Sequence, residues 1–385
     1  MPAPIVVKPD LPAAATGSGS SVPPSVAAND PGESSRYQLT SEQEARWPVK
    51  GPEPLPGALL PDHLIVAFYG NPKSKKMGIL GQLPPEEMLP RLEAAATEWA
   101  KVERGRKVLP ALHAVVTVAQ GKPGKSGMYR LQHPDELIER VLSWAEDRRW
   151  IVFLDVQIGG SSVAEELPRL AKYLERPYVH LALDPEYAMQ PGGIPGRRVG
   201  TLDAAQVNEA VELLATIVDQ QNIPPKVLVV HRFSEGMLTN YRQIKLDQRV
   251  QVVMNMDGFG TPRIKEDAYK FYIALEPVQF TGFKLFYKKD RPMMPPERVL
   301  GLTPSERGLA TVEEAATLCR TVGRSARAEA PQEIGLLAEV LWNGGQTEPA
   351  ISLLTECIGL FQKRGEPAFS RPLEIYRTPR RWPQP

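Results

Sequence analysis

The sequence is short of cysteine, of net charge and of long apolar runs, and each shortage excludes a class of protein. Only two cysteines occur in 385 residues, Cys319 and Cys357. Two thiols do not make a disulfide framework, and no CxxC spacing for a structural zinc site is present. A formal net charge of +1 gives no electrostatic attraction to nucleic acid or to an anionic membrane. No segment approaches the roughly 18–20 apolar residues that span a bilayer. We therefore expect no nucleic acid partner and no membrane span.

The N-terminal region, residues 1–56, has few large apolar side chains and is rich in proline, alanine, serine and glycine. Such a segment cannot offset the entropy lost on ordering, so we expect a disordered tail. It lacks the basic start and apolar run of about 7–15 residues that mark a signal peptide. Its composition is nevertheless typical of the tether behind a processed signal or a lipid anchor. This favours export over a cytoplasmic protein with a disordered tail, and the localisation stays open.

From residue 57 onward, short apolar runs alternate with amphipathic segments of helical length, which predicts βαβ units and a parallel sheet. Seven strands are expected, at His63–Asn71, Val108–Gln120, Trp150–Gly159, Tyr178–Met189, Lys226–Phe233, Val250–Gly260 and Phe280–Lys288. Seven repeats without a GxGxxG turn after the first strand favour an α/β fold of the (β/α)8 TIM-barrel type over an open doubly wound sheet. The eighth strand is expected at Val299–Thr303, a short run that closes the barrel weakly.

The predicted barrel domain covers residues 57–303. Three amphipathic segments follow it, so a helical appendage is expected at 304–367 and a loose tail at 368–385. One helix pair has spacing like a tetratricopeptide repeat, but about three copies are needed to bury a core. We therefore expect these helices to pack against the barrel.

Polar residues that end apolar strands are the candidate site, because barrel enzymes carry their chemistry at the C-terminal ends of the strands. The predicted catalytic residues are Asp155, Asp184, Glu186 and Asp257, which follow three different strands. The predicted substrate-binding residues are Tyr69, Gln157, Tyr187, His231, Lys284 and Tyr287. Clustered carboxylates raise one another's pKa and commonly mark function.

The Asp184-Pro185-Glu186 triplet carries the most specific chemistry. Residues i and i+2 of a strand point the same way, so both carboxyl groups can face the mouth of the barrel. A Glu186 with a raised pKa can protonate a leaving oxygen while Asp184 holds charge beside it, as in glycoside hydrolysis. Each signal also has a structural interpretation: Asp-Pro and Asp257-Gly258 are ordinary turn sequences. Asp155 can cap a helix or pair with Arg232.

The order of these strand-end signals resembles that of glycoside hydrolase barrels of the chitinase-like and lysozyme-like kinds. Asp184–Glu186 matches the Asp-x-Glu that ends their strand four. Met254–Asp257 is similar to the Met-x-Tyr-Asp of chitinase-like members, with Met256 replacing the tyrosine, and Gly159–Gly160 is similar to the Gly-Gly pair after their strand three. The resemblance implies that Glu186 is the acid/base and that Asp184 supports attack by the substrate's own N-acetyl oxygen. The chain departs from these families in the apolar residues (HLAL) that precede Asp184.

From about residue 59 to 302 the chain also resembles uncharacterised secreted or lipid-anchored bacterial proteins of the glycosidase-like barrel class. Three functions stay open, because a fold does not decide among them. The first is hydrolysis of a glycosidic bond in a polysaccharide or peptidoglycan-like polymer, with a carbohydrate partner and no metal or cofactor. The second is metal-dependent chemistry on a sugar or phosphate, with Asp184, Glu186, His231 and Asp257 as ligands. The third is a non-catalytic barrel that binds a glycan or a partner.

Overall fold

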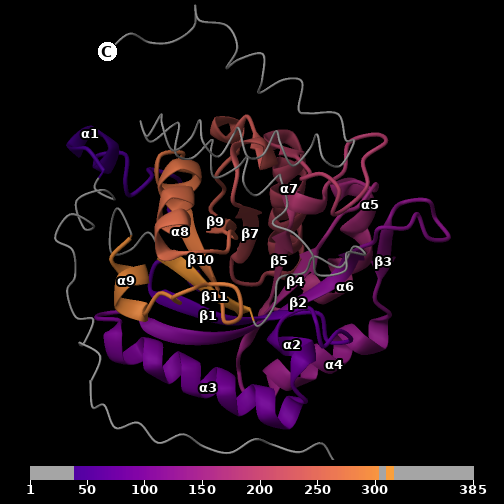
Figure 1. Cartoon of the computed structure of the whole chain (residues 1–385), viewed down its shortest axis with the longest axis horizontal. Helices are drawn as coiled ribbons and strands as arrows, with labels where there is room; N and C mark the ends of the chain where they lie inside the picture. The colour runs from indigo at the N-terminus through magenta and orange to yellow at the C-terminus, as the bar shows by residue number, and fades with distance from the viewer. Residues whose placement is uncertain (1–38, 303–308, 316–385) are drawn as a thin grey trace, which may run out of the picture. The chain divides into compact units, whose positions relative to one another are not determined.

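The computed structural model describes residues 39–302 and 309–315 (Figure 1). Seven parallel strands form a curled sheet, a half-barrel, within an α/β fold. In spatial order the strands are β1 (His63–Gly70), β2 (Lys107–Ala119), β4 (Ile151–Val156), β5 (Val179–Leu183), β7 (Lys226–Arg232), β9 (Val250–Met256) and β10 (Phe280–Phe286). The seven strands expected from the sequence are confirmed. A short β3 (Arg130–Gln132) pairs antiparallel with the end of β2.

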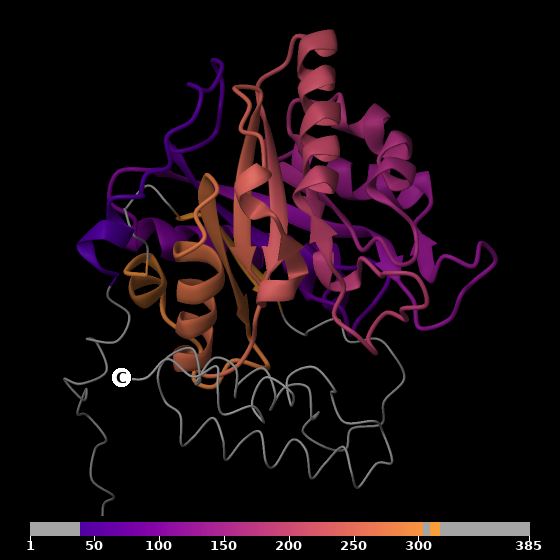
Figure 2. The ribbon, with the colours of Figure 1, turned by 90° about the horizontal axis from the view of Figure 1, so that it is seen from above.

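The helices lie on the outside of the curled sheet (Figures 1 and 2). They are α1 (Ser41–Glu44), α2 (Ile79–Gln82), α3 (Pro85–Val102), α4 (Asp135–Glu146), α5 (Val163–Glu166), α6 (Ala171–Leu174), α7 (Ala204–Gln221), α8 (Pro262–Tyr269) and α9 (Pro296–Leu300). Shorter pieces are η1 (Pro168–Leu170), η2 (Pro185–Tyr187), η3 (Glu235–Met237), η4 (Tyr241–Gln243), a π-helix η5 (Lys270–Ala274), and the paired strands β6 (Leu202–Asp203) and β8 (Leu238–Thr239). α3 packs on β1 and β2, and α7 packs on β7 and β9.

The two long helices show why the sequence forms them. α3 begins at Pro85, where the missing N–H would have no partner in any case, and buries one apolar stripe that includes Leu92 and Trp99. α7 begins with a capping box: the Asp203 carboxylate accepts from the Ala205 backbone N–H, and the Gln206 side chain accepts from the Asp203 backbone. It ends at Asn222, whose left-handed backbone suits asparagine.

The inner face of the sheet is divided along the strands into an apolar half and a polar half. The apolar half holds Ile65, Ala67, Ala111, Ile151, Phe153, Ala182, Val227, Val229 and Val253, all buried. Because every second residue of a strand faces the same way, the next inward position on each strand follows two residues later. Those positions are Tyr69, His113, Asp155, Asp184, His231 and Asn255, all buried. The apolar half is thus a floor under a layer of polar side chains, and we keep the word floor for it.

The predicted eighth strand at Val299–Thr303 is wrong. Val299 is buried within α9, which begins at Pro296 directly after its N-cap Pro295, and proline favours the first position of a helix. The strand that lies in parallel between β10 and β1 is instead β11 (Leu309–Ala315). That segment falls in the region predicted to be helical. Its two consecutive glutamates resemble the acidic first turn of a helix, while Thr311 and Val312 have the branched side chains that strands prefer.

Part of the predicted N-terminal tail lies within the described residues. Trp47 is buried, and its indole Nε1 donates to the carbonyl of Ala274 at 2.9 Å, so residues around it are held against the body of the fold. Residues 1–38 lie outside the described residues, as do the helices and tail predicted beyond residue 315, with Cys319 and Cys357. None of the helices in the described part of the chain combines the length and the hydrophobicity of a bilayer-spanning segment.

Candidate functional site

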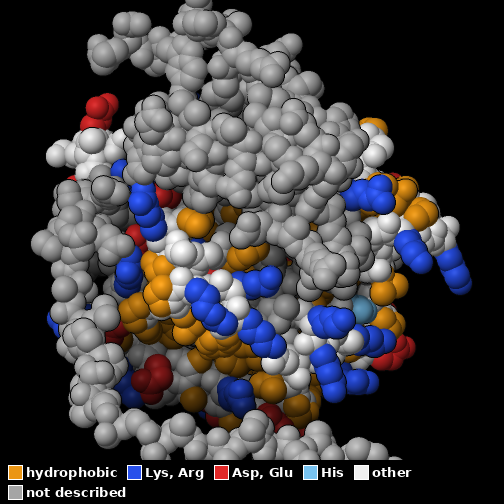
Figure 3. Space-filling view, viewed as in Figure 1, with side chains coloured by type: hydrophobic (Ala, Val, Ile, Leu, Met, Phe, Trp, Pro, Cys, Tyr) orange, Lys and Arg blue, Asp and Glu red, His pale blue; other side chains and the backbone are white. Residues whose placement is uncertain are grey.

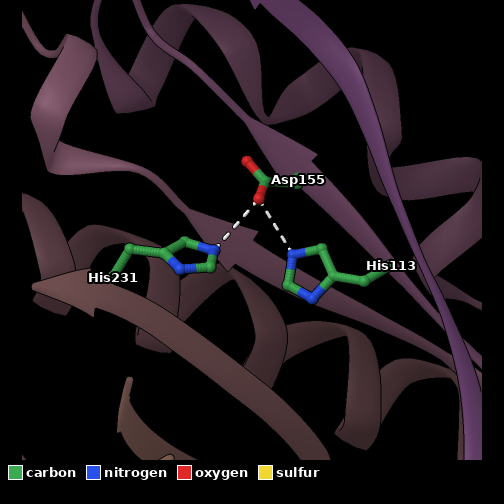
Figure 4. Close-up of side chains that lie close together, drawn as sticks. All are labelled: His113, Asp155 and His231. Carbon is green, nitrogen blue, oxygen red and sulfur yellow. Dashed lines mark hydrogen bonds and ion pairs between the residues drawn. The ribbon is translucent and has the colours of Figure 1, made fainter. Parts of the chain in front are cut away.

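Asp155 is the centre of the polar layer. It lies on β4 between His113 of β2 and His231 of β7, and all three side chains are fully buried. Its Oδ2 accepts from the Nε2 of His113 at 2.9 Å and from the Nε2 of His231 at 3.1 Å. Figure 4 shows the two imidazole rings on either side of this oxygen, with the second carboxylate oxygen directed away. The pairing with Arg232 that the sequence left open does not form, because Arg232 pairs with Glu276.

Burial by itself would raise the pKa of Asp155, because a charge in a poorly polarisable interior is costly. The hydrogen bonds from His113 and His231 outweigh burial and hold the pKa of Asp155 well below its usual value. The two imidazoles thus favour the ionised form of Asp155 even though its side chain is buried.

The polar chain continues from His231 to Lys284. His231 Nδ1 lies 3.2 Å from Asn255 Nδ2 and 3.3 Å from Asp257 Oδ2. Asp257 in turn contacts Lys284, whose Nζ is 3.1 Å from Oδ1 and 3.2 Å from Oδ2. The same Nζ lies 3.3 Å from the centroid of the Tyr69 ring, a cation–π contact in a desolvated place. β1, β4, β7, β9 and β10 thus each contribute to one connected group.

Asp184 and Glu186 lie at the end of β5. Asp184 is the N-cap of η2: its Oδ1 accepts from the backbone N–H of Glu186 at 3.1 Å, and its Oδ2 accepts from the side-chain amide of Gln157 at 3.3 Å. Burial raises the pKa of Asp184 well above its usual value, and the charges of Glu186, Asp155 and Asp257 raise it further. Glu186 is the more accessible of the pair, at 8% exposed against 2%.

Two glycine contacts fix the segment that carries Glu186. The backbone N–H of Gly200 donates to the Glu186 carbonyl at 2.6 Å, and Gly159 donates to the Tyr187 carbonyl at 2.8 Å. A Cβ at Gly200 would lie 2.5 Å from the backbone of Ala188, and one at Gly159 would lie 2.6 Å from the Met128 carbonyl oxygen. Only glycine permits these approaches, so the loop after η2 is bonded to Glu186 and the loop after β4 to the neighbouring Tyr187.

Eight of the ten predicted site residues are joined in this network by contacts or by electrostatic interaction. They are Tyr69, Asp155, Gln157, Asp184, Glu186, His231, Asp257 and Lys284. Tyr187 follows Glu186 in η2 and is buried, whereas Tyr287 lies beyond β10 and is 37% exposed.

His113 and Asn255 belong to the site and were not predicted. β2 runs well past the polar layer to pair with β3, so the polar residues at its end lie away from the site: Thr117 donates to Glu166. The sequence does contain a signal for His113: it is a single polar residue in the apolar run of β2, and it lies two positions after Ala111, on the same face of the strand. Asn255 was noted only as part of the Met254–Asp257 motif.

The acidic residues of the site do not form a surface patch. On the face seen in Figure 3, Lys and Arg side chains stand among apolar ones over the described part, and acidic side chains show mainly at its margins. The site carboxylates are all less than a tenth exposed. No protein-family model matches the chain, and no curated protein matches it.

Proposed function

We propose that this protein is a hydrolase of the glycosidase type that cleaves a glycan by carboxylate acid/base chemistry. The observation that carries the proposal is the Asp184–Glu186 pair at the end of β5. Repulsion between the two is one cause of the raised pKa of Asp184, so the pair resists losing both protons together. One protonated and one ionised carboxyl group is the combination that glycoside hydrolysis requires.

In this proposal the more accessible Glu186 takes up the proton that the pair shares and delivers it to the glycosidic oxygen. Asp184 positions it, since its carboxyl group holds the Glu186 backbone N–H. Asp257, directly after β9, is the second carboxylate, and the ammonium of Lys284 balances its charge. Tyr69, Tyr187 and Tyr287 are the proposed aromatic contacts to sugar faces, with Gln157 and His231 as hydrogen-bonding partners.

The variant Glu186→Gln tests this function. It keeps the shape of the side chain and cannot transfer a proton, so we expect kcat/KM on a cleaved glycan to fall by about 10²–10⁴-fold with folding intact. Release of reducing ends from chitin, peptidoglycan and soluble β-linked oligosaccharides is the assay. The matched control is Glu212→Gln, an exposed glutamate of α7. Full activity in Glu186→Gln would refute the role of Glu186. A wild-type chain that binds these glycans without cleaving them would instead be a non-catalytic glycan-binding protein.

We also propose that the curled sheet closes into a (β/α)8 barrel of the TIM type. The support is the position of β11: Thr311 is in register with Gly282 of β10 and with Ile65 of β1, and β1 also pairs with β2. In such a barrel the polar layer lies at the C-terminal ends of the strands, where barrel enzymes place their active sites.

A further inference from the structure

At the centre of the polar layer lie two histidines and one aspartate, a combination of side chains that can bind a metal ion. His113, Asp155 and His231 come from three strands and each offer one ligand atom, and these three atoms lie within 4.8 Å of one another. Zinc bonds of about 2.0–2.2 Å to nitrogen and oxygen place neighbouring ligand atoms of a tetrahedral site roughly 3.3 Å apart. The two nitrogens lie 2.9 and 3.1 Å from the carboxylate oxygen, so small rotations of the side chains would admit an ion.

The charge balance of the layer favours a divalent cation. Asp155, Asp184, Glu186 and Asp257 are four carboxyl groups that are each less than a tenth exposed. The ammonium of Lys284 contacts Asp257 in this group. Lys265 is near, but its ammonium pairs with Asp290 at 2.8 Å. Carboxyl groups gathered in a buried place repel one another and are costly to ionise, and a bound dication would lower that cost.

Two further oxygens at the same place have no hydrogen-bond partner among the described residues. They are Asp155 Oδ1 and Asn255 Oδ1, both buried, and a buried unsatisfied acceptor costs roughly 1–3 kcal/mol. If His231 bound a metal through Nε2, its proton would move to Nδ1. Nδ1–H would then donate to Asp257, which already lies 3.3 Å away. A flip of the Asn255 side-chain amide would exchange its Nδ2 and Oδ1, so that Oδ1 could accept from the Nδ1–H of His231.

We propose that His113, Asp155 and His231 bind one divalent transition-metal ion of the zinc class, with Asp257 orienting His231 from behind. A carboxylate that accepts the remaining N–H of a metal-bound histidine is a recurrent feature of zinc sites. Two imidazoles and one carboxylate select zinc and its neighbours rather than magnesium or calcium, which take all-oxygen ligand sets. The metal site shares His231 and Asp257 with the proposed hydrolytic site, but it uses neither Asp184 nor Glu186 as a ligand, so metal binding can be tested apart from glycan hydrolysis.

The test is metal content and affinity in the full chain without a histidine tag. Protein made in zinc-supplemented medium and dialysed should contain about one zinc per chain by elemental analysis. Cobalt exchanged into the site should give visible d–d absorption. His113→Gln and His231→Gln are the informative variants, since the glutamine amide can still donate to Asp155 but is a weak metal ligand. Each should lower zinc affinity by at least about 10-fold, while circular dichroism shows a folded chain.

The matched control is His63→Gln, a half-buried histidine at the start of β1, which should keep full zinc content. Wild-type protein with no bound zinc, or glutamine variants with wild-type affinity, would overturn the metal site and leave a hydrogen-bonded triad. If a variant does not fold, the test uses the wild-type protein instead, and its melting temperature Tm is measured with added zinc and with added magnesium. A rise in Tm of about 5 °C with zinc alone supports the site, and equal Tm values refute it. None of these readouts depends on glycan cleavage.

Discussion

Lys226 is a residue whose burial serves the fold and not the chemistry. It lies at the start of β7, next to the floor residue Val227, and its Nζ donates to the carbonyls of Arg176 at 2.6 Å and Val179 at 3.0 Å. Burial lowers the pKa of Lys226 to about 7 from 10.5. Below pH 7 both the folded and the unfolded chain hold the proton, and the folded chain bears the cost of a buried charge.

This pKa predicts how stability changes with pH. Between pH 7 and 10.5 the unfolded chain holds more protons, so the free energy of unfolding should rise with pH relative to the variant Lys226→Met. The relative gain from pH 7 to 10 should reach about 4 kcal/mol at most, at 1.36 kcal/mol per pH unit. Urea unfolding of both proteins across this range measures it. If the unfolding free energies of the wild type and of Lys226→Met change with pH in the same way, Lys226 keeps an ordinary pKa.

The contact between Asp257 and Lys284 predicts a strong energetic coupling. Lys284→Met leaves Asp257 buried without its cation and should destabilise the protein by about 3–5 kcal/mol. The double variant Asp257→Asn with Lys284→Met removes both charges and should recover most of that loss. A double-mutant cycle by urea unfolding gives the coupling directly. If the two substitutions change the free energy of unfolding additively, the coupling energy between Asp257 and Lys284 is zero and the prediction is wrong.

At the level of single residues, the sequence indicates which polar side chains are candidates for the site better than it indicates which of them lie side by side. Asp155, Asp184, Glu186 and Asp257 were identified because each follows an apolar run. His113 was missed because the end of β2 does not coincide with the polar layer. Which residue of a long strand lies level with its neighbours depends on register, and register is set by long-range packing that a strand's own sequence does not contain.

Among the elements, η2 depends on its glycine neighbour. In Gly200→Ala the new Cβ would lie 2.5 Å from backbone atoms of Pro185 and Ala188, so η2 must move. We expect a loss of about 1–3 kcal/mol in stability and a larger than 10-fold loss of any activity that uses Glu186. Gly236→Ala is the control, since it lies nearby, where Thr201 donates to its carbonyl, and its Cβ would meet no atom within 4 Å. Equal behaviour of the two variants would contradict this role of Gly200.

The strands were predictable as elements because a parallel sheet covered by helices consists of continuous apolar runs. Val299–Leu300 belongs to such a run and nevertheless lies in α9, since Pro295 and Pro296 start a helix there. β11 was missed for the opposite reason. Glu313 and Glu314 in LATVEEA match an acidic helix start, and only pairing with β10 and β1 makes this segment a strand. Propensity is a weak guide when tertiary contacts decide.

For the whole molecule, closure of the sheet predicts a pattern of hydrogen exchange. If β11 completes a ring, the amides of Leu309–Ala315 should exchange as slowly as those of β10, because both would open only with the sheet. Exchange followed by mass spectrometry on peptides from both segments measures this. Fast exchange in 309–315 together with slow exchange in β10 would mean that the sheet stays open beside β1. The exposed residues 122–126, between β2 and β3, serve as a fast-exchanging reference.

The floor has a consequence for how this protein can change over time. Residues such as Ala67, Ala182 and Val229 support the polar layer without taking part in its hydrogen bonds, and they lie two positions before Tyr69, Asp184 and His231 on the same strands. Substitutions there would alter heat resistance while the reactive groups keep their places. Stability thus depends on the floor and reactivity on the polar layer. Selection can therefore change the stability of the protein through the floor residues and its specificity through the polar ones, each with little effect on the other.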